Sequence, residues 1–302
     1  MATNVAVLTK PEVEEIHYQK GDVSLCLMVN RRTRSLRVVD FRAGTHPLKR
    51  EVVEHIARDE GLERAYTVVE REEAPSWIRL GFHKEGNIPG FYKRSDAYLL
   101  GMAIEPDHAL ESGTRIALSA RPEHAIGDRA ERAYQAGRRM VREKAPDSDS
   151  RVKVQLAKDV DVARGLSAAS RAGRALTQFE PFGRDGVRSA YLCTARGGFS
   201  VLVGVENQRC FDNAYIDVLT APRSEKETFS TASALSKVSE LLEKEGVVSS
   251  FAITLAESVE MTAAMVVAGF RRTGRLPSHL LVRGERQDAF LWSRKLADTD
   301  HD

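Results

Sequence analysis

The chain has few cysteines and no long apolar run, and each absence excludes a class of protein. Its 302 residues include three cysteines, Cys26, Cys193 and Cys210, far apart in the sequence. An odd, scattered set matches neither a disulfide framework nor a zinc-finger spacing. No apolar stretch approaches the roughly 20 residues that a membrane helix needs, and residues 1–10 lack the pattern of a secretion signal. We therefore expect a cytoplasmic protein.

Neither sign of charge is in excess. Lys and Arg number 45 and Asp and Glu number 43, for a net charge of +2, and 42% of the residues are hydrophobic. This balance leaves no electrostatic footprint for nucleic acid or an anionic membrane, so we expect neither as a partner. The eight histidines form no i, i+4 pair of the kind that binds zinc on a helix, so we also expect no metal.

What the sequence does contain is an internal repeat. Residues 81–89 and 269–277 both read G-F-x-x-x-G-x-aliphatic-P, and each copy is followed by Asp-Ala-aromatic-Leu, at 96–99 and 288–291. A repeat at so long an offset indicates two related domains rather than a solenoid. The chain length agrees, because it allows about two domains with a core each.

The elements around each copy follow the same order. In the first half, apolar periodicity and turn residues predict strands at 23–29 and 35–41, a helix capped by Thr45 that ends near Gly61, a strand at 65–69 and a short helix at 74–80. In the second half they predict helices within 159–176, strands at 189–195, 199–205 and 213–219, a helix that ends at Gly246, a strand at 248–255 and a helix at 258–268.

These patterns predict an α/β protein with two successive domains, each a mixed twisted sheet flanked by helices. The expected boundaries are 17–104 for the first domain, 105–150 for a linker and 151–297 for the second domain. The linker contains a charged helix at about 128–144, which we interpret as a solvated bridge, although its arginines could also form a phosphate-binding face. Residues 145–150 are the clearest linker segment.

Three stretches resemble the GNAT superfamily of N-acetyltransferases, and more narrowly the β-lysine N-acetyltransferases. Residues 80–98 are similar to the amino-terminal region of that narrower family. Residues 258–270 and 288–293 resemble the penultimate helix and the closing strand of many acetyltransferases. The resemblance implies tandem GNAT-like domains and acetyl-CoA as a co-substrate, bound where two parallel strands, 213–219 and 248–255, splay apart.

The resemblance also implies which residues contact acetyl-CoA. The pantetheine arm would lie along the first of these strands, and the pyrophosphate would meet the backbone N–H groups of the turn into the next helix, as anions do at helix N-termini. The matching positions here are Val218, Leu219, Ala221, Arg223, Lys226, Thr228, Ser230 and Thr231. In the first domain the turn at 43–47 is too short for this role, so we expect no CoA there.

The turn departs from the family pattern because residues 222–232 contain no glycine. Glycine lets phosphate oxygens approach the backbone closely. Glu225 and Glu227 also place negative charge where a pyrophosphate would bind. We therefore describe the turn as degenerate. In the alternative interpretation, Thr228 or Ser230 only caps the helix, whose positive end favours the two glutamates.

For catalysis, Asp217 is the candidate base because it is a carboxylate in an otherwise apolar strand. Asp40 is its expected counterpart in the first domain, so both aspartates could instead be structural. The tyrosine that many acetyltransferases use as an acid corresponds to Met265. Thiolate protonation would then fall to water or to Ser258, which could equally be a helix N-cap.

The predicted function is transfer of acetyl from acetyl-CoA to a primary amine, such as a small amino acid. The alternative is an inactive GNAT-like module that serves binding or dimerisation and has lost acetyl-CoA binding. The missing glycines, the two glutamates and Met265 favour the alternative, whereas Asp217 and Ser258 favour the enzyme. A homodimer is expected only by analogy with the superfamily.

Overall fold

The computed structural model describes residues 10–93, 95–105, 123–144, 152–174, 181–184 and 186–297. The expected linker segment 145–150 lies outside these ranges. The chain forms two compact units. Unit 1 draws on Met1–Val68, Glu73–His83 and Leu100–Ile116, and unit 2 on Val69–Glu72, Lys84–Leu99 and Ala117–Asp302. No helix in the described part of the chain combines the length and the apolar character that a membrane crossing requires.

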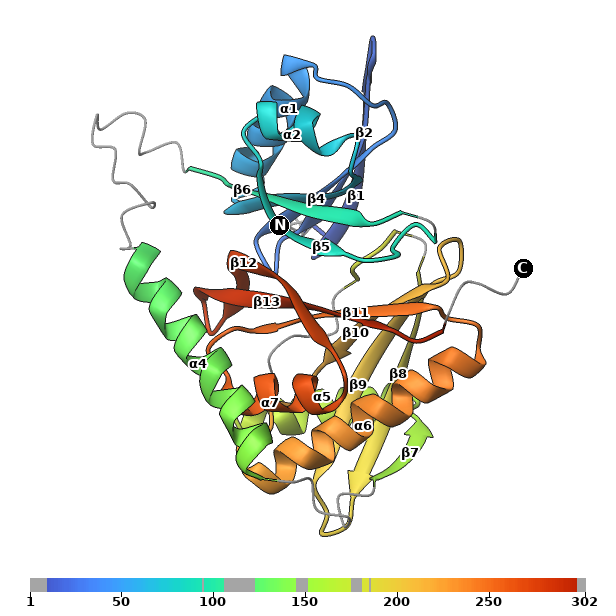
Figure 1. The fold of residues 1–302 in the computed structure, drawn as a ribbon. Coiled ribbons are helices and arrows are strands. Elements are labelled where there is room, and N and C mark those ends of the chain that lie inside the picture. The colour runs from blue at the N-terminus through green and yellow to red at the C-terminus, as the bar shows by residue number, and fades with distance from the viewer. Residues whose placement is uncertain are drawn as a thin grey trace, which may run out of the picture. The chain divides into compact units, whose positions relative to one another are not determined.

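The described part of unit 1 contains a mixed sheet together with helices (Figure 1). Its elements are β1 (Val13–Lys20), β2 (Val23–Asn30), β3 (Ser35–Asp40), α1 (Pro47–Asp59), β4 (Arg64–Glu70), α2 (Ala74–Arg79) and most of β6 (Ala97–Ala103). The strand order is β1-β2-β3-β4-β6, with β3 and β4 parallel and β1, β2 and β3 antiparallel.

The expected cap of helix α1, Thr45, is wrong by one residue. His46 caps α1 through its Nδ1, which accepts from Leu48 N at 3.2 Å, while the Thr45 hydroxyl accepts from Arg79.

Unit 2 contains a larger mixed sheet. Its strands are β5 (His83–Ile88), β7 (Val152–Leu156), β8 (Val187–Ala195), β9 (Ser200–Gln208), β10 (Asn213–Val218), β11 (Ser249–Leu255), β12 (Arg271–Val282) and β13 (Glu285–Lys295). They run in the order β5-β12-β13-β11-β10-β9-β8-β7, and only β10 and β11 pair in parallel among the pairings described for this unit. Strand β7, like β1 of unit 1, was not predicted from the sequence.

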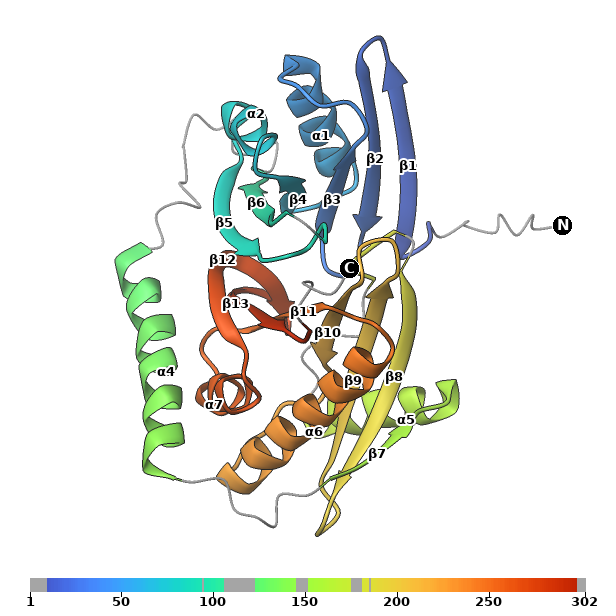
Figure 2. The same cartoon turned by 45° about the vertical axis from the view of Figure 1, so that its right-hand side comes forward.

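Helices cover both faces of this second sheet. They are α4 (Glu123–Glu143), α5 (Asp159–Arg171), α6 (Glu225–Lys244) and α7 (Val259–Val267). The main core lies on the side of α6 and α7, where Ile216 and Val218 pack with Leu235 and Met265. The other face is covered by α5, whose apolar residues pack against a small cluster around Leu219. Figure 2 shows α6 and α5 on opposite sides of β8 and β9.

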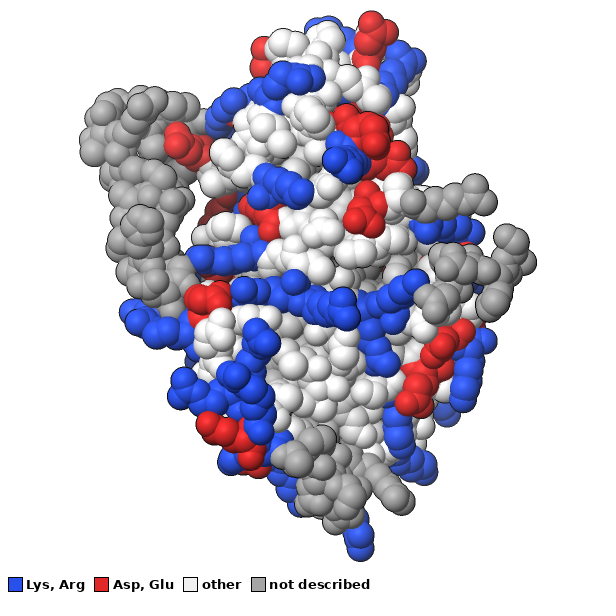
Figure 3. Space-filling model, in the orientation of Figure 1, with Lys and Arg blue, Asp and Glu red and all other residues white. Residues whose placement is uncertain are grey.

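The charged helix α4 differs from the expected solvated bridge, because one of its faces is packed. A Cβ atom at Gly137 would lie 2.6 Å from Thr262 Cγ2, so α4 and α7 cross in close contact. Tyr134 packs edge-on against Phe290, with ring centroids 5.8 Å apart. The outer face carries basic side chains with acidic ones among them (Figure 3), and it has a depression of about 300 Å³. Helix α4 therefore has a buried face of small residues and, opposite it, a charged face that points outward.

Both copies of the repeat motif begin at a helix end of the same type. After α2, Gly81 N donates to Ile78 O at 3.0 Å and Phe82 N to Trp77 O at 3.1 Å. After α7, Gly269 N donates to Val266 O at 3.1 Å and Phe270 N to Met265 O at 3.0 Å. Gly81 and Gly269 have φ of 95° and 83°, which an L side chain rarely adopts. The repeated Gly-Phe therefore encodes a Schellman ending that precedes a buried phenylalanine.

The remaining motif residues shape a hairpin and a close backbone contact. Asp96 accepts from Gly90 N at 2.9 Å and Asp288 accepts from Ser278 N at 2.9 Å, so each aspartate holds the residue after the motif proline. The second glycines of the two copies, Gly86 and Gly274, pair between β5 and β12. A Cβ atom at Gly274 would lie 2.5 Å from Gly86 Cα. The two motif copies thus meet where neither has a side chain.

Candidate active site

The two parallel strands of unit 2 stop pairing beside Asp217. Their register runs from Asn213↔Ser249 to Ile216↔Ala252 and ends there, although both strands continue. Beyond this point β10 pairs only with β9 and β11 only with β13 among the described pairings. Strands that continue without a common hydrogen-bond ladder must diverge, because paired strands stay about 4.8 Å apart. The resemblance to acetyltransferases implied a parting of these two strands.

Asp217 is buried, at 2% relative exposure, and faces away from the main core. Successive side chains of a strand point to opposite faces. Ile216 and Val218 pack in the core on the α6 side, so Asp217 lies on the α5 side with Tyr215 and Leu219. Its cross-strand neighbour is Gly204. Gly204 itself thus places no side chain beside the carboxylate.

A second buried carboxylate, Glu206, lies on the same face and was not identified from the sequence. It pairs across the strands with Tyr215, two residues before Asp217, and is 1% exposed. Its carboxylate accepts from Phe182 N at 2.8 Å and from Gly183 N. A Cβ atom at Gly186 would lie 2.3 Å from Glu206 Cγ. Glu206 therefore anchors the segment 181–184 against the sheet.

The segment 181–184 places the ring of Phe182 in a cluster of aromatic side chains. The Phe182 ring stacks on Tyr215 with centroids 5.0 Å apart and meets Phe251 edge-on at 4.9 Å. Tyr215 and Phe251 are partners in the parallel register, just before the strands part. The expected strand stopped at Val205, so Glu206 escaped notice. The signal that made Asp217 a candidate, a carboxylate within an apolar strand, is present at Glu206 once β9 is seen to extend to Gln208.

The turn into α6 already holds an anion, which belongs to the chain itself. Glu227 accepts from Arg174 Nη1 at 2.6 Å, from Arg174 Nη2 at 3.1 Å and from Arg223 N at 2.7 Å. Burial acts to raise the pKa of Glu227, but the hydrogen bonds from Arg174 and Arg223, together with the charges of both arginines, lower it overall. The Ser224 hydroxyl accepts from Glu227 N at 3.3 Å and caps the helix. Thr228 and Ser230 are therefore not the cap.

The hydroxyls predicted to bind the cofactor point back onto their own helix. Thr228 donates to Ser224 O at 2.9 Å, Ser230 to Lys226 O at 2.9 Å and Thr231 to Glu227 O at 2.8 Å. All three residues are buried. Lys226, by contrast, is exposed.

The backbone that leads into this turn is also engaged. Leu219 N donates to Leu202 O at 2.9 Å and Ala221 N donates to Arg174 O at 3.0 Å. Val218 is paired with Val203 of β9. The Arg223 guanidinium donates to Gly173 O at 2.5 Å. Of the residues predicted to contact the cofactor, the cations Arg223 and Lys226 are thus exposed at the turn. The hydroxyl groups of the predicted threonines and serine point away from it.

Ser258 is the N-cap of α7, and its hydroxyl accepts from Met261 N at 3.1 Å. Of the two interpretations of Ser258, the hydrogen bond bears out the helix N-cap. Met265 is fully buried in the main core. In this chain Met265 therefore contributes to core packing.

In unit 1, the turn between the parallel strand β3 and helix α1 is closed by an ion pair. Strands β3 and β4 stop pairing after Val38↔Thr67. Lys49, in the first turn of α1, makes an ion pair with Asp40, and its ammonium also donates to Arg42 O at 2.5 Å and Gly44 O at 2.9 Å. The side chains of Lys49 and Asp40 are 1% and 4% exposed. The ammonium thus fills the turn that precedes α1.

By the registers of the two parallel strand pairs, Asp40 and Asp217 differ in position by one residue. Asp217 is the first residue after the last parallel pair of its strand, whereas Asp40 is the second. A one-residue offset moves a side chain to the other face of a sheet. Asp40 accordingly faces α1 and Lys49, and the position of unit 2 that matches it is Val218. Asp217 has no acidic counterpart in unit 1.

No protein-family model matches the chain, and no curated protein matches it. Among solved structures, a spermidine N-acetyltransferase from Vibrio cholerae in complex with CoA and spermine is 12% identical, with a TM-score of 0.39 over 49% of this chain and 96% of that one. The ribosomal-protein-S18-alanine N-acetyltransferase from Escherichia coli is 15% identical, with a TM-score of 0.38 over 50% of this chain and 98% of that one. Neither likeness is high enough to carry a conclusion about what this chain does.

Proposed function

We propose that the chain is an acetyl-CoA-dependent N-acetyltransferase of the GNAT type that acts on a primary amine. The working domain would be the C-terminal half, 151–297, and residues 17–104 would be a degenerate copy of it, joined through 105–150. The observation that carries the proposal is the end of parallel pairing between β10 and β11 at Ile216↔Ala252, directly beside the buried Asp217. The element and strand orders support the duplication, since β2-β3-β4-β6 in unit 1 matches β9-β10-β11-β13 in unit 2.

In the proposed reaction the amine nitrogen attacks the thioester carbonyl carbon, and the bond from that carbon to sulfur breaks. The amine proton passes to the Asp217 carboxylate and the thiolate takes a proton from water. The β9 neighbour of Asp217 is Gly204, which places no side chain of its own beside the carboxylate. The Ser258 hydroxyl would serve α7 as its cap and could still donate its own proton, since it accepts rather than donates in the Met261 hydrogen bond.

The amine side would be the α5 face of the sheet. There the rings of Phe182, Tyr215 and Phe251 lie together, and the carboxylates of Asp217 and Glu206 lie on the same face. Aromatic faces and carboxylates both attract an alkylammonium group. A primary amine with an aliphatic body, as in a small amino acid or a polyamine, fits this chemistry. Glu206 would act mainly by positioning the segment 181–184.

The cofactor side fits acetyl-CoA on one condition. Arg223, Lys226 and the start of α6 offer positive charge to a pyrophosphate. Glu227 occupies the turn, however, and takes up Arg174 and the Arg223 N–H. A bound pyrophosphate would have to displace the Glu227 carboxylate and accept from the same donors. We therefore expect weak acetyl-CoA binding that strengthens when Glu227 is neutralised.

The second candidate function, an inactive binding or dimerisation module, is favoured by one specific observation. The hydroxyls of Thr228, Ser230 and Thr231 are turned inward, and Glu227 already satisfies the donors of the turn. In this case Glu227 would be a permanent structural anion. The homodimer expected from the superfamily would then be the functional form.

Isothermal titration calorimetry with acetyl-CoA separates the two candidates. We expect the wild-type protein to bind, and the Glu227→Gln variant to bind more tightly. Glu225→Gln is the matched control, because Glu225 lies in the same turn but pairs with Lys144 instead. Lack of binding by both the wild type and Glu227→Gln at millimolar acetyl-CoA would contradict the enzyme and favour the module. Binding would justify a screen of primary amines by CoA release.

A further inference from the structure

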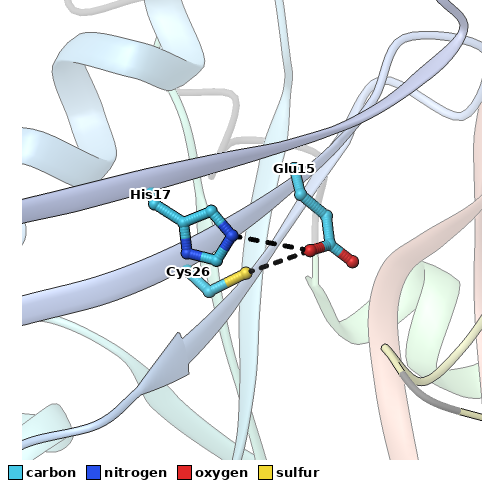
Figure 4. Close-up of side chains that lie close together, drawn as sticks. All are labelled: Glu15, His17 and Cys26. Carbon is cyan, nitrogen blue, oxygen red and sulfur yellow. Dashed lines mark hydrogen bonds and ion pairs between the residues drawn. The ribbon is translucent and has the colours of Figure 1, made fainter.

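Strands β1 and β2 of unit 1 bring a carboxylate, an imidazole and a thiol together on one face. His17 lies directly opposite Cys26 in the antiparallel register, and Glu15 lies two residues before His17. Residues two apart on a strand share a face, and directly opposite Cβ atoms are ~4.5–5.5 Å apart. The strand geometry therefore directs all three side chains to the same point, as Figure 4 shows.

The potential ligand atoms are close enough for one ion to reach all of them. His17 Nε2 lies 3.7 Å from Glu15 Oε2, and Cys26 Sγ lies 3.9 Å from the same oxygen. Each residue offers an atom within 4.8 Å of the others. In a tetrahedral zinc site with bonds of ~2.0–2.3 Å, neighbouring ligand atoms are roughly 3.3–3.8 Å apart. Small rotations of exposed side chains would close the difference.

We propose that Glu15, His17 and Cys26 form a binding site for a transition-metal ion, with zinc as the ion whose chemistry fits best. Thiolate and imidazole ligands favour zinc over magnesium and calcium, which prefer oxygen ligands. A thiolate and a carboxylate together carry two negative charges and neutralise Zn²⁺. The thiol proton, now donated toward Glu15, is released to solvent when the ion binds.

Burial gives the site a closed side and an open side. Cys26 is fully buried, which holds its sulfur in place, whereas the side chains of His17 and Glu15 are 57% and 36% exposed. An ion can therefore enter from solvent, and water can take the fourth position. Since β1 is the terminal strand of the sheet order, the ion would also tie this edge strand to β2. The site is independent of the proposed acetyl transfer.

Zinc titration of the full-length protein against a chromophoric chelator tests the proposal. We expect one Zn²⁺ per chain, and loss of at least ~100-fold in affinity in His17→Gln and in Glu15→Gln, because even changes behind the ligands cost 10–100-fold. Both residues are exposed, so these variants should fold as the wild type does. Co²⁺ in place of zinc should give a thiolate-to-cobalt charge-transfer band that disappears in Cys26→Ala.

Two controls address other surface groups. His55→Gln removes the histidine of an exposed His55–Asp59 pair, 3.3 Å apart, on α1. Cys210→Ser removes the exposed cysteine. Both variants should keep wild-type zinc affinity and the cobalt band. Zinc binding that survives His17→Gln, that is lost in either control, or that gives a cobalt spectrum without thiolate character would overturn the assignment, as would the absence of stoichiometric binding in the wild type.

Discussion

The helices that follow the diverging strands carry opposite charges at their starts in the two units. In unit 1 the first turn of α1 carries Lys49, a cation, whereas in unit 2 the first turn of α6 carries Glu227, an anion. The N-terminus of a helix carries a partial positive charge, so it favours Glu227 and opposes Lys49. Asp40 is what makes the buried lysine tolerable, because a buried charge without a partner is costly.

This difference in charge between the starts of α1 and α6 indicates which of the two turns could accept an anionic ligand. The Lys49–Asp40 pair is almost completely buried and its ammonium is also bound by two carbonyl groups. The Glu227–Arg174 pair is partly open, with side chains 18% and 24% exposed. In unit 2 an incoming anion would compete with the Glu227 carboxylate for the hydrogen-bond donors of Arg174 and Arg223, which already bind an anionic group. In unit 1 it would instead have to separate a buried ion pair.

The largest effect should follow from replacing the carboxylate that has no counterpart in unit 1. As a general base, Asp217 should contribute ~10²–10⁴-fold to turnover, so Asp217→Asn should lower acetyl-CoA-dependent CoA release by that factor. Asp212→Asn is the matched control, because Asp212 precedes the same strand but pairs with Lys93 at the surface. Equal activity in the wild type and Asp217→Asn would remove this distinction between the units.

The second largest effect should come from removing the buried Lys49–Asp40 ion pair of unit 1. Asp40→Asn leaves the Lys49 ammonium buried without its counter-ion, which should cost about 3–5 kcal/mol of unfolding free energy. Denaturant unfolding followed by circular dichroism measures this cost. In the double variant Asp40→Leu with Lys49→Met, both charges are absent, so most of the loss should be recovered. A single variant as stable as the wild type would mean that the pair does not close this turn.

The contact between the second motif glycines should give a smaller loss. Gly274→Ala would place a methyl group 2.5 Å from Gly86 Cα and 2.6 Å from Glu85 O. Backbone cannot move aside as a flexible side chain can, so we expect a loss of about 1–3 kcal/mol. Gly86→Ala should behave alike.

Gly284→Ala is the control for this contact, because Gly284 has φ of 83° but no atom within 4 Å of a built Cβ. It should cost only the strain of a left-handed residue, about 1 kcal/mol. Thermal or denaturant unfolding of the three variants ranks the effects. Gly274→Ala no more destabilised than Gly284→Ala would show that the strands can part at this point.

The smallest effect concerns Glu227 and sharpens the charge contrast directly. Glu227→Gln should raise acetyl-CoA affinity about tenfold, equivalent to roughly 1.4 kcal/mol, because it frees Arg174 and removes a competing anion. It should also change the pH dependence of stability. The pKa of Glu227 in the folded state lies below the ordinary value of 4.5. Its contribution is therefore complete above about pH 4.5 and is lost as the pH falls through the folded-state value.

Unfolding of the wild type and Glu227→Gln at about pH 7 and about pH 3 checks the sign of this linkage. The stability difference between the two proteins should shrink toward the acid side. A difference that stays constant with pH would mean that Glu227 holds the turn by its shape and not by its charge.

Local patterns predicted the fold well because they act over a few residues. The Gly-Phe helix endings, the hairpins and the apolar strands are determined by φ preferences, capping and periodicity. Strands β1 and β7 were not predicted, and the packing of helix α4 also differed from the expectation. Its small residues Ala130 and Gly137 mark a packed face only once α7 is known to lie against it. Nothing in the charge pattern of α4 alone reveals that neighbour.

The site was predictable in part. Asp217 became a candidate because a carboxylate in an apolar strand is conspicuous, and the parting of the strands was implied by the resemblance to acetyltransferases. The role of Glu227 depends on Arg174, which lies 53 residues away in the sequence. The face of Asp40 depends on where the parallel register ends, which is a property of two strands together. Sequence reasoning that treats one segment at a time does not reach such pairings.

The pairing of β5 with β12 has a consequence for anyone who divides this protein. The segment Lys84–Leu99 belongs to unit 2, whereas the residues on both sides of it belong to unit 1. A gene fragment that starts after residue 105 would encode a sheet whose β12 has lost its neighbour on that side. An uncovered strand edge invites pairing between molecules. Expression of either half by itself should therefore give aggregates, and the chain should be handled as one piece.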